Sequence, residues 1–152
     1  HIEPTAFFWS WTMNNHWETN YKAYQEGWIE FRYVVRPHAG DYDAVREQRF
    51  GREVCQPLFA MPGAASQPPL ASALTLSDPG VVVTSLRPSR DGKAVMVRLF
   101  NTTEQPREVA LTWGRPMGKT WLSNPMEAQL SPAGEKVSMP QYEMTTLRVE
   151  ME

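Results

Sequence analysis

The chain has 152 residues, with 15 basic and 17 acidic side chains and a net charge of −2 at neutral pH. This length is enough for one ordinary domain or for two small parts that share a core. Because the charges are nearly balanced and scattered, the composition excludes the basic surface of a protein that binds nucleic acid or an anionic membrane. No apolar run approaches the roughly 20 residues that span a bilayer.

Cysteine usage and the first residues bear on where the protein works. A single cysteine, Cys55, excludes an internal disulfide and a zinc site built from cysteines. The opening residues carry neither the basic nor the apolar stretch of a signal peptide. We therefore expect a soluble, cytoplasmic protein. Because the chain lacks an initiator methionine and enters an aromatic segment almost at once, we also expect it to be a portion of a longer polypeptide.

Aromatic residues concentrate in the first quarter of the chain, where ten of them lie in residues 7–33. The run TAFFWSWTM (residues 5–13) is typical of a strand. Because successive side chains of a strand point to opposite faces, we expect Phe8 to face the core together with one of the two alternating sets of side chains beside it. The run WIEFRYVVR (residues 28–36) alternates apolar and polar side chains, which predicts a half-buried strand. Both segments are expected to need partner strands.

The loop between these strands holds the densest set of polar and aromatic groups, MNNHWETNY (residues 13–21). An aromatic ring can cover the C–H face of a sugar while neighbouring polar groups bind its hydroxyls. The carbohydrate-contact candidates are Asn14, Asn15, His16, Trp17, Asn20, Tyr21 and Tyr24. The alternative is that the polar side chains fix the loop by bonding to its own backbone.

One helix is predicted in DYDAVREQRFGREV (residues 41–54). Asp41 or Asp43 is suited to cap its first turn, and Gly51 is expected to end or interrupt it. Three arginines recur at intervals of three residues in this segment: Arg46, Arg49 and Arg52. They suggest either an anion site or a solvated helix face with salt bridges to Glu47 and Glu53, and we favour the solvated face.

Residues 57–73 contain four prolines with glycine and serine, which is typical of a linker, and we place a boundary near residue 70. Beyond it, short strands are predicted at 80–88, 93–101, 107–113, 119–124, 135–139 and 142–151. Asp91-Gly92 is expected to supply the positive φ angles of the first hairpin. Strands without helices between them predict a β-sandwich. The triplet at Asn101 is a formal glycosylation acceptor of a kind that often arises by chance.

No catalytic constellation stands out in the sequence. A glycosidase needs a pair of carboxylates on either side of the bond it cleaves, and a triad enzyme needs Ser, His and Asp within reach of one another. The three histidines, His1, His16 and His38, lack a metal-ligand spacing. We therefore assign no catalytic residue and no metal ligand to this chain.

The run MNNHWETNYKAYQEGWIEFRYVVRPH, followed by DYDAVREQRFGREVCQPL, resembles the C-terminal region of glycoside hydrolase family 38, the α-mannosidases. Members of that family carry an N-N-x-W-x-T-N segment and then a strand of the F-R-Y kind that ends in R-P-H. The tail VVVTSLRPSRDGKAVMVRLFNTT, closing with YEMTTLRVEM, is similar to the small β-sandwich that ends such chains.

The resemblance implies an all-β fold: part of a supersandwich with one short helix, followed by a small antiparallel β-sandwich. Residues 1–69 would hold the last strands of a mutarotase-like supersandwich, the helix and the Pro-rich linker, and residues 70–152 the terminal sandwich. In the family, the zinc ion and the aspartate nucleophile belong to an N-terminal domain with no counterpart here. The implied partner is the remainder of the parent glycosidase, or a second copy of this chain.

Three functions remain open at this point. The first is a non-catalytic, domain-docking part of an α-mannosidase-like enzyme, with zinc expected only in the absent catalytic domain. The second is a stand-alone carbohydrate-binding module that takes a mannoside on the loop of residues 13–24. The third is a sandwich that binds a protein strand along the edge of its aromatic segment.

Overall fold

The computed structural model describes residues 5, 7–14, 22, 24–56, 58, 60, 62 and 72–152. The chain divides into two compact units, residues 1–39 and residues 40–152. The helix therefore groups with the sandwich rather than with the aromatic segment. The predicted boundary near residue 70 falls among residues outside the described part and stays a prediction.

The first unit has extended backbone but no strand among its described residues, so the strand predictions for 5–13 and 28–36 are wrong for this chain. Phe8 is exposed rather than part of a core. The Ser10 and Tyr33 hydroxyls form a hydrogen bond of 2.5 Å, but no backbone ladder joins the two segments. Alternation alone cannot make a strand, because a strand also needs neighbouring backbone groups to bond with.

The second unit begins with the helix α1 (Ala44–Cys55). Asp43 caps it, since its Oδ1 accepts from the backbone N–H groups of Val45 and Arg46 at 2.9 and 3.1 Å. The helix runs through Gly51 rather than ending there, because a single glycine costs a helix interior only about 1 kcal/mol.

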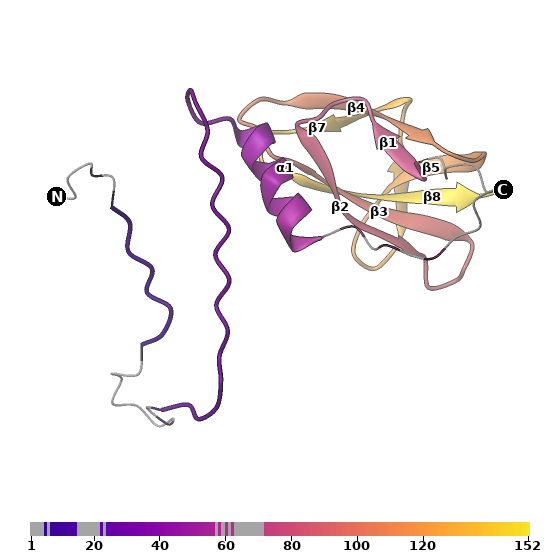
Figure 1. Ribbon diagram of the computed structural model, residues 1–152. Helices are drawn as coiled ribbons and strands as arrows, with labels where there is room; N and C mark the ends of the chain where they lie inside the picture. Colours follow the sequence, from indigo (N-terminus) through magenta and orange to yellow (C-terminus); the bar gives the residue numbers. More distant parts are fainter. Residues whose placement is uncertain are drawn as a thin grey trace. The chain divides into compact units, whose positions relative to one another are not determined.

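In the described residues that follow, eight strands form two antiparallel sheets of three and five strands, and the sandwich is drawn in Figure 1. The small sheet has the order β1-β4-β7 and the large sheet the order β2-β3-β8-β5-β6. Their bounds are β1 (Leu74–Leu76), β2 (Val81–Pro88), β3 (Ala94–Asn101), β4 (Arg107–Trp113), β5 (Met117–Ser123), β6 (Gln129–Pro132), β7 (Lys136–Met139) and β8 (Met144–Met151). The predicted small antiparallel sandwich is confirmed, while β1 and β6 were not expected.

The core lies between the two sheets. It is built from aliphatic side chains that alternate along the strands, as a half-buried sheet requires. The buried members are Val81, Val97, Leu99, Val109, Val137, Met139, Leu147 and Val149. Leu99, Met139 and Leu147 are the largest of the fully buried side chains, and the two leucines come from neighbouring strands of the large sheet.

The hairpin between β2 and β3 is closed by side chains as well as by backbone. Gly92 has a φ of +69°, so only the glycine of the Asp91-Gly92 pair adopts the positive angle that was expected of both. Asp91 accepts from the Ser89 hydroxyl at 2.6 Å, and from the nearly buried Arg148 of β8 at 2.6 Å. The hairpin is thereby fastened to the outer face of the large sheet.

The loop between β5 and β6 (residues 124–128, called the strap below) reaches the same hairpin. Its Glu127 is 8% exposed, and one carboxylate oxygen accepts from Arg87 at 2.6 Å while the other accepts from the backbone N–H of Arg90 at 2.7 Å. Because β6 and β2 are opposite edges of the five-stranded sheet, the strap crosses the outer face. Met96 and Arg148, neighbours in that face, are consequently nearly buried.

Asn101 fixes the end of β3. Its carboxamide is fully buried and donates to the backbone carbonyls of Gln105, Met139 and Pro140 at 2.8 to 3.1 Å. Its oxygen accepts from the backbone and the hydroxyl of Thr103. The side chain of the formal acceptor triplet therefore has a structural role.

Candidate functional site

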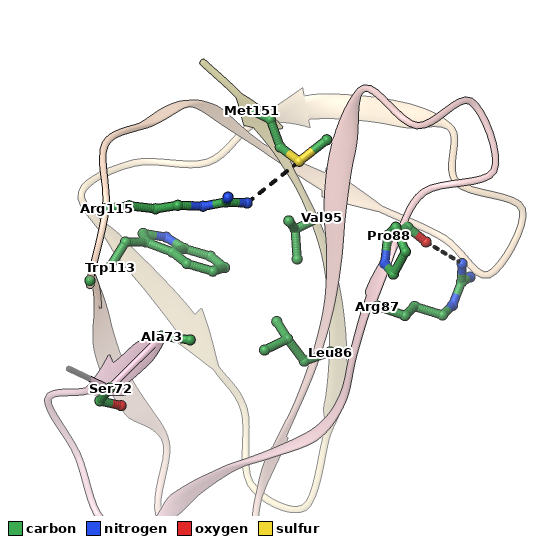
Figure 2. Close-up of a pocket in the computed structure, with 10 residues that line it drawn as sticks. Ser72, Ala73, Leu86, Arg87, Pro88, Val95, Trp113, Arg115 and Met151 are labelled. Atoms are coloured by element: carbon green, nitrogen blue, oxygen red, sulfur yellow. Dashed lines mark hydrogen bonds between the residues drawn. The ribbon is translucent and has the colours of Figure 1, made fainter. Parts of the chain in front are cut away.

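One end of the sandwich is open between the two sheets, and a cavity of about 520 Å³ lies there, which we call the Trp113 cavity (Figure 2). It is lined by Ser72, Ala73, Leu86, Arg87, Pro88, Val95, Trp113, Gly114, Arg115 and Met151. The small sheet ends at this point, since Leu74 of β1 is the partner of Trp113 at the end of β4. The inner face of the large sheet continues beyond it and is left uncovered.

The close approach of the two chain segments beside Trp113 depends on a glycine. Gly114 donates its N–H to the Ala73 carbonyl at 3.1 Å, and a Cβ at Gly114 would collide with the carbonyl oxygen of Ser72. Only glycine lets the backbone pass so near. The Trp113 side of the cavity is thus set by backbone packing rather than by a flexible loop.

The floor of the cavity is apolar. Leu86 is the register partner of Val97 and Pro88 that of Val95, so these residues belong to the adjoining edge of the large sheet. Leu86 is 46% exposed although it points to the same side of the sheet as the core. In Figure 2 the indole of Trp113 projects into the cavity from one side, and Leu86 and Val95 stand across from it.

Two arginines line the rim, and their surroundings differ. Arg87 is held by Glu127 of the strap at 2.6 Å and by the carbonyl of Pro88 at 3.2 Å. The backbone N–H of Arg90 and the guanidinium of Arg87 together lower the pKa of the Glu127 carboxyl below its ordinary value, so Glu127 remains charged at neutral pH. Arg115 instead donates to the sulfur of Met151 at 3.6 Å.

Trp113 also borders a second hollow of about 220 Å³ on the other side of the sandwich end. That hollow is lined by Leu111, Met117, Gly118, Thr120, Gly134, Glu135 and Val137 together with Trp113. The indole is partly buried and packs against the core from its edge. It therefore forms a wall between two hollows.

The residues predicted to contact carbohydrate are only partly within the described chain. Asn15, His16, Trp17, Asn20 and Tyr21 lie outside it. Asn14 and Tyr24 are exposed, and the Lys22 ammonium lies 5.5 Å from the centre of the Tyr24 ring. The predicted sugar-binding role of these residues stays a prediction.

The arginine row of α1 is occupied with neighbours on the helix. Arg46 bonds to Glu47 at 2.8 Å and Arg49 to Glu53 at 2.8 Å, as the favoured reading of the sequence predicted. Arg52 donates to Gln56 at 3.1 Å. These pairs account for the row without an anion.

The described residues also bear on metal-ligand groups and on helices that could span a membrane. Within the described residues, no group of three or more His, Cys, Asp or Glu side chains is placed to hold a metal ion. No helix in the described part of the chain is long and apolar enough to cross a membrane. Cys55 is a free, exposed cysteine.

The comparison with protein families bears on the sandwich just described. Residues 80–151 match the family model described as Glycosyl hydrolases family 38 C-terminal beta sandwich domain. The resemblance predicted from the sequence is confirmed over these residues. The matched residues run from β2 to β8 and so include most of the sandwich that surrounds the Trp113 cavity. Searches of curated proteins and of solved structures found no match.

The Trp113 cavity was not predicted from the sequence. The available signal was the Trp-Gly-Arg run at the end of a predicted strand, residues 113–115, in which a strand ends with an aromatic beside a cation. That signal is local, whereas the other wall comes from β2, β3 and β8. The strand register of the sandwich brings these parts together.

Proposed function

We propose that this chain is the non-catalytic C-terminal part of an α-mannosidase-like glycoside hydrolase, where it docks onto the remainder of the same polypeptide and supports it. The parent enzyme hydrolyses terminal α-mannosides, and its zinc ion and nucleophile lie in its N-terminal domain. The family match of residues 80–151 supports the placement in family 38. The docking role is supported by the exposed apolar side chains of the first unit.

The observation that carries the docking role is the exposure of large apolar side chains in the first unit. Trp9 is 96% exposed, Trp28 is fully exposed, and Phe7, Phe8 and Trp11 are each exposed by more than three-quarters. Burying one such side chain contributes about 1.5–3 kcal/mol, and soluble monomers rarely leave extensive contiguous apolar surface exposed. The remainder of the parent chain is the occupant that a supersandwich segment requires.

The size of the native polypeptide tests the assignment to a larger enzyme. An antibody raised against this chain should detect a band several times larger than 17.4 kDa in the source cell. A band at 17.4 kDa alone would contradict the proposal. The chain alone should not hydrolyse a nitrophenyl α-mannoside, and turnover by the purified chain would place catalysis here instead.

Paired substitutions in the intact parent test the docking role. Trp9→Ser with Trp28→Ser should lower the melting temperature of the parent by several degrees, because both indoles lose a buried site. Met126→Ser is the control, since Met126 is 71% exposed on the strap. Equal melting temperatures for the double variant, the control and the unaltered enzyme would refute docking through this segment.

A further inference from the structure

We propose that the Trp113 cavity binds the pyranose ring of a neutral saccharide, with a mannoside as the first candidate. The inference rests on the proposed function, since membership of a glycosidase is what brings the chain to glycans. It moves the carbohydrate contact away from the loop of residues 13–24 and into the sandwich. Three features of the cavity support it: the flat face of the Trp113 ring, the hydrogen-bond donors of Arg115 at the rim, and the small number of charged groups available to a ligand.

The indole supplies a flat apolar wall in a fixed position. Trp113 is held by pairing with Leu74 and by packing on the core, and its ring projects into the cavity (Figure 2). One face of a pyranose is a patch of C–H groups, which an aromatic ring covers without losing hydrogen bonds. Because the ring is already ordered, little conformational freedom is lost on binding.

Arg115 supplies donors at the rim. Its guanidinium has five N–H groups in a planar fork, and its contact in the cavity is the thioether of Met151 at 3.6 Å, a weak acceptor. Hydroxyl and ring oxygens of a sugar are better acceptors than a thioether. Arg87 is less suited, because Glu127 already holds it at 2.6 Å.

The balance of charge favours a neutral ligand over an anion. A carboxylate placed over Leu86, Val95 and Pro88 would lose water on an apolar floor. It would gain one cation at an exposed rim, where salt and solvent weaken the attraction. A pyranoside would lose less hydration than a carboxylate, because it carries no charge and its outward hydroxyls would remain in water.

The size of the cavity agrees with one or two sugar rings. Its volume of about 520 Å³ lies within the range of about 300–1,000 Å³ that is usual for small-molecule sites. It is open to solvent on one side and offers few polar contacts. We therefore expect a dissociation constant on the order of 1 mM for a monosaccharide.

Calorimetric titration and saturation-transfer NMR on the 152-residue chain test the proposal, with methyl α-mannopyranoside and mannobiose as probes. Leu86→Trp fills the cavity and should weaken binding by at least about tenfold. Arg115→Ala removes an exposed donor, leaves the fold intact and should weaken binding about tenfold. Met126→Trp adds the same indole on the strap and should bind as the unaltered chain does.

Two results would overturn the proposal. One is that neither methyl α-mannopyranoside nor mannobiose binds, whether or not a uronate binds. The other is that binding persists unchanged in both Leu86→Trp and Arg115→Ala, which would place the sugar elsewhere. If the antibody detects a large enzyme in the source cell but the 152-residue chain binds no mannoside, this inference alone is refuted. A 17.4 kDa native band with binding intact would defeat only the docking role.

Discussion

Glu127 shows how a single residue is placed against its intrinsic preference. Its φ of +68° is unusual for a residue with a side chain, and its carboxylate is nearly buried. Two charge-assisted contacts, to Arg87 and to the N–H of Arg90, hold it there. Nothing in the local sequence indicates this, because the partners lie 40 and 37 residues away. Long-range pairing of this kind could not be predicted from one sequence.

The acid dependence of stability should report on Glu127 and Asp91. The N–H of Arg90 and the guanidinium of Arg87 lower the pKa of Glu127, and the Ser89 hydroxyl, the Lys93 N–H and Arg148 lower the pKa of Asp91. A group whose pKa is lowered by folding contributes stability that is present above its unfolded pKa, about 4. That stability is lost as the pH falls through the folded pKa. Urea midpoints measured from about pH 7 to pH 2 should decline in the acid range.

Glu127→Gln separates the contribution of the strap from that of other carboxylates. The variant should be less stable than the unaltered chain at neutral pH. The difference should shrink as the pH falls below the unfolded pKa of about 4 and through the lowered folded pKa of Glu127. Glu135→Gln, at an exposed position, serves as the control. A constant difference at all pH values would show that the charge of Glu127 has no part in the fastening.

At the scale of elements, patterns with local causes were predicted and patterns that need partners were not. The cap of α1 at Asp43 and the hairpin at residues 89–92 follow from nearby residues. β1 and β6 have three and four residues and become strands only through β4 and β5. Conversely, residues 28–36 have a strand-like alternation but no ladder in this chain. Whether these segments form strands therefore depends on pairing with neighbouring strands rather than on the intrinsic strand propensity of their residues.

Two glycines should respond oppositely to alanine. Gly51 lies inside α1 with open space around a Cβ, so Gly51→Ala should stabilise the second unit by about 0.5–1 kcal/mol. Gly114→Ala should destabilise it, because the new methyl group collides with backbone at Ser72. Urea unfolding followed by far-UV circular dichroism measures both. Equal effects of the two changes would contradict the close approach at the Trp113 cavity.

The whole molecule combines a well-packed sandwich with an aromatic segment whose described aromatic side chains are exposed. The sandwich could be predicted because its strands are separated by turn residues and because its tail resembles a known family. The state of the first unit could not, since the same aromatic pattern serves a core strand or a docking surface. The Trp113 cavity also required the assembled register of two sheets.

Self-association should depend on the first unit. At micromolar concentrations the chain alone should sediment as species larger than a monomer, because exposed indoles bury one another when no other partner is present. Trp9→Ser with Trp28→Ser should shift the distribution toward the monomer, whereas Leu130→Ser, on the exposed edge strand β6, should not. Analytical ultracentrifugation distinguishes the two, and a monomeric unaltered chain would contradict the expectation.

Leu99 should carry a large share of the stability of the sandwich. Its side chain is fully buried at the centre of the core, so Leu99→Ala should cost about 2–5 kcal/mol. Thr112→Ala, at an exposed position of β4, should change the free energy of unfolding by no more than about 0.5 kcal/mol. Both values come from urea denaturation. A loss below about 1 kcal/mol at Leu99 would mean that the core is less well packed than described.

The engaged amide of Asn101 has a consequence for producing this protein in a secretory host. Attaching an oligosaccharide requires access to the same nitrogen that donates to Gln105, Met139 and Pro140. Enzymatic transfer can therefore compete only while the nascent polypeptide is still unstructured. Any sugar later found at this position would mark molecules that were modified before the end of β3 was fixed, and those molecules should be the ones that the quality-control machinery retains.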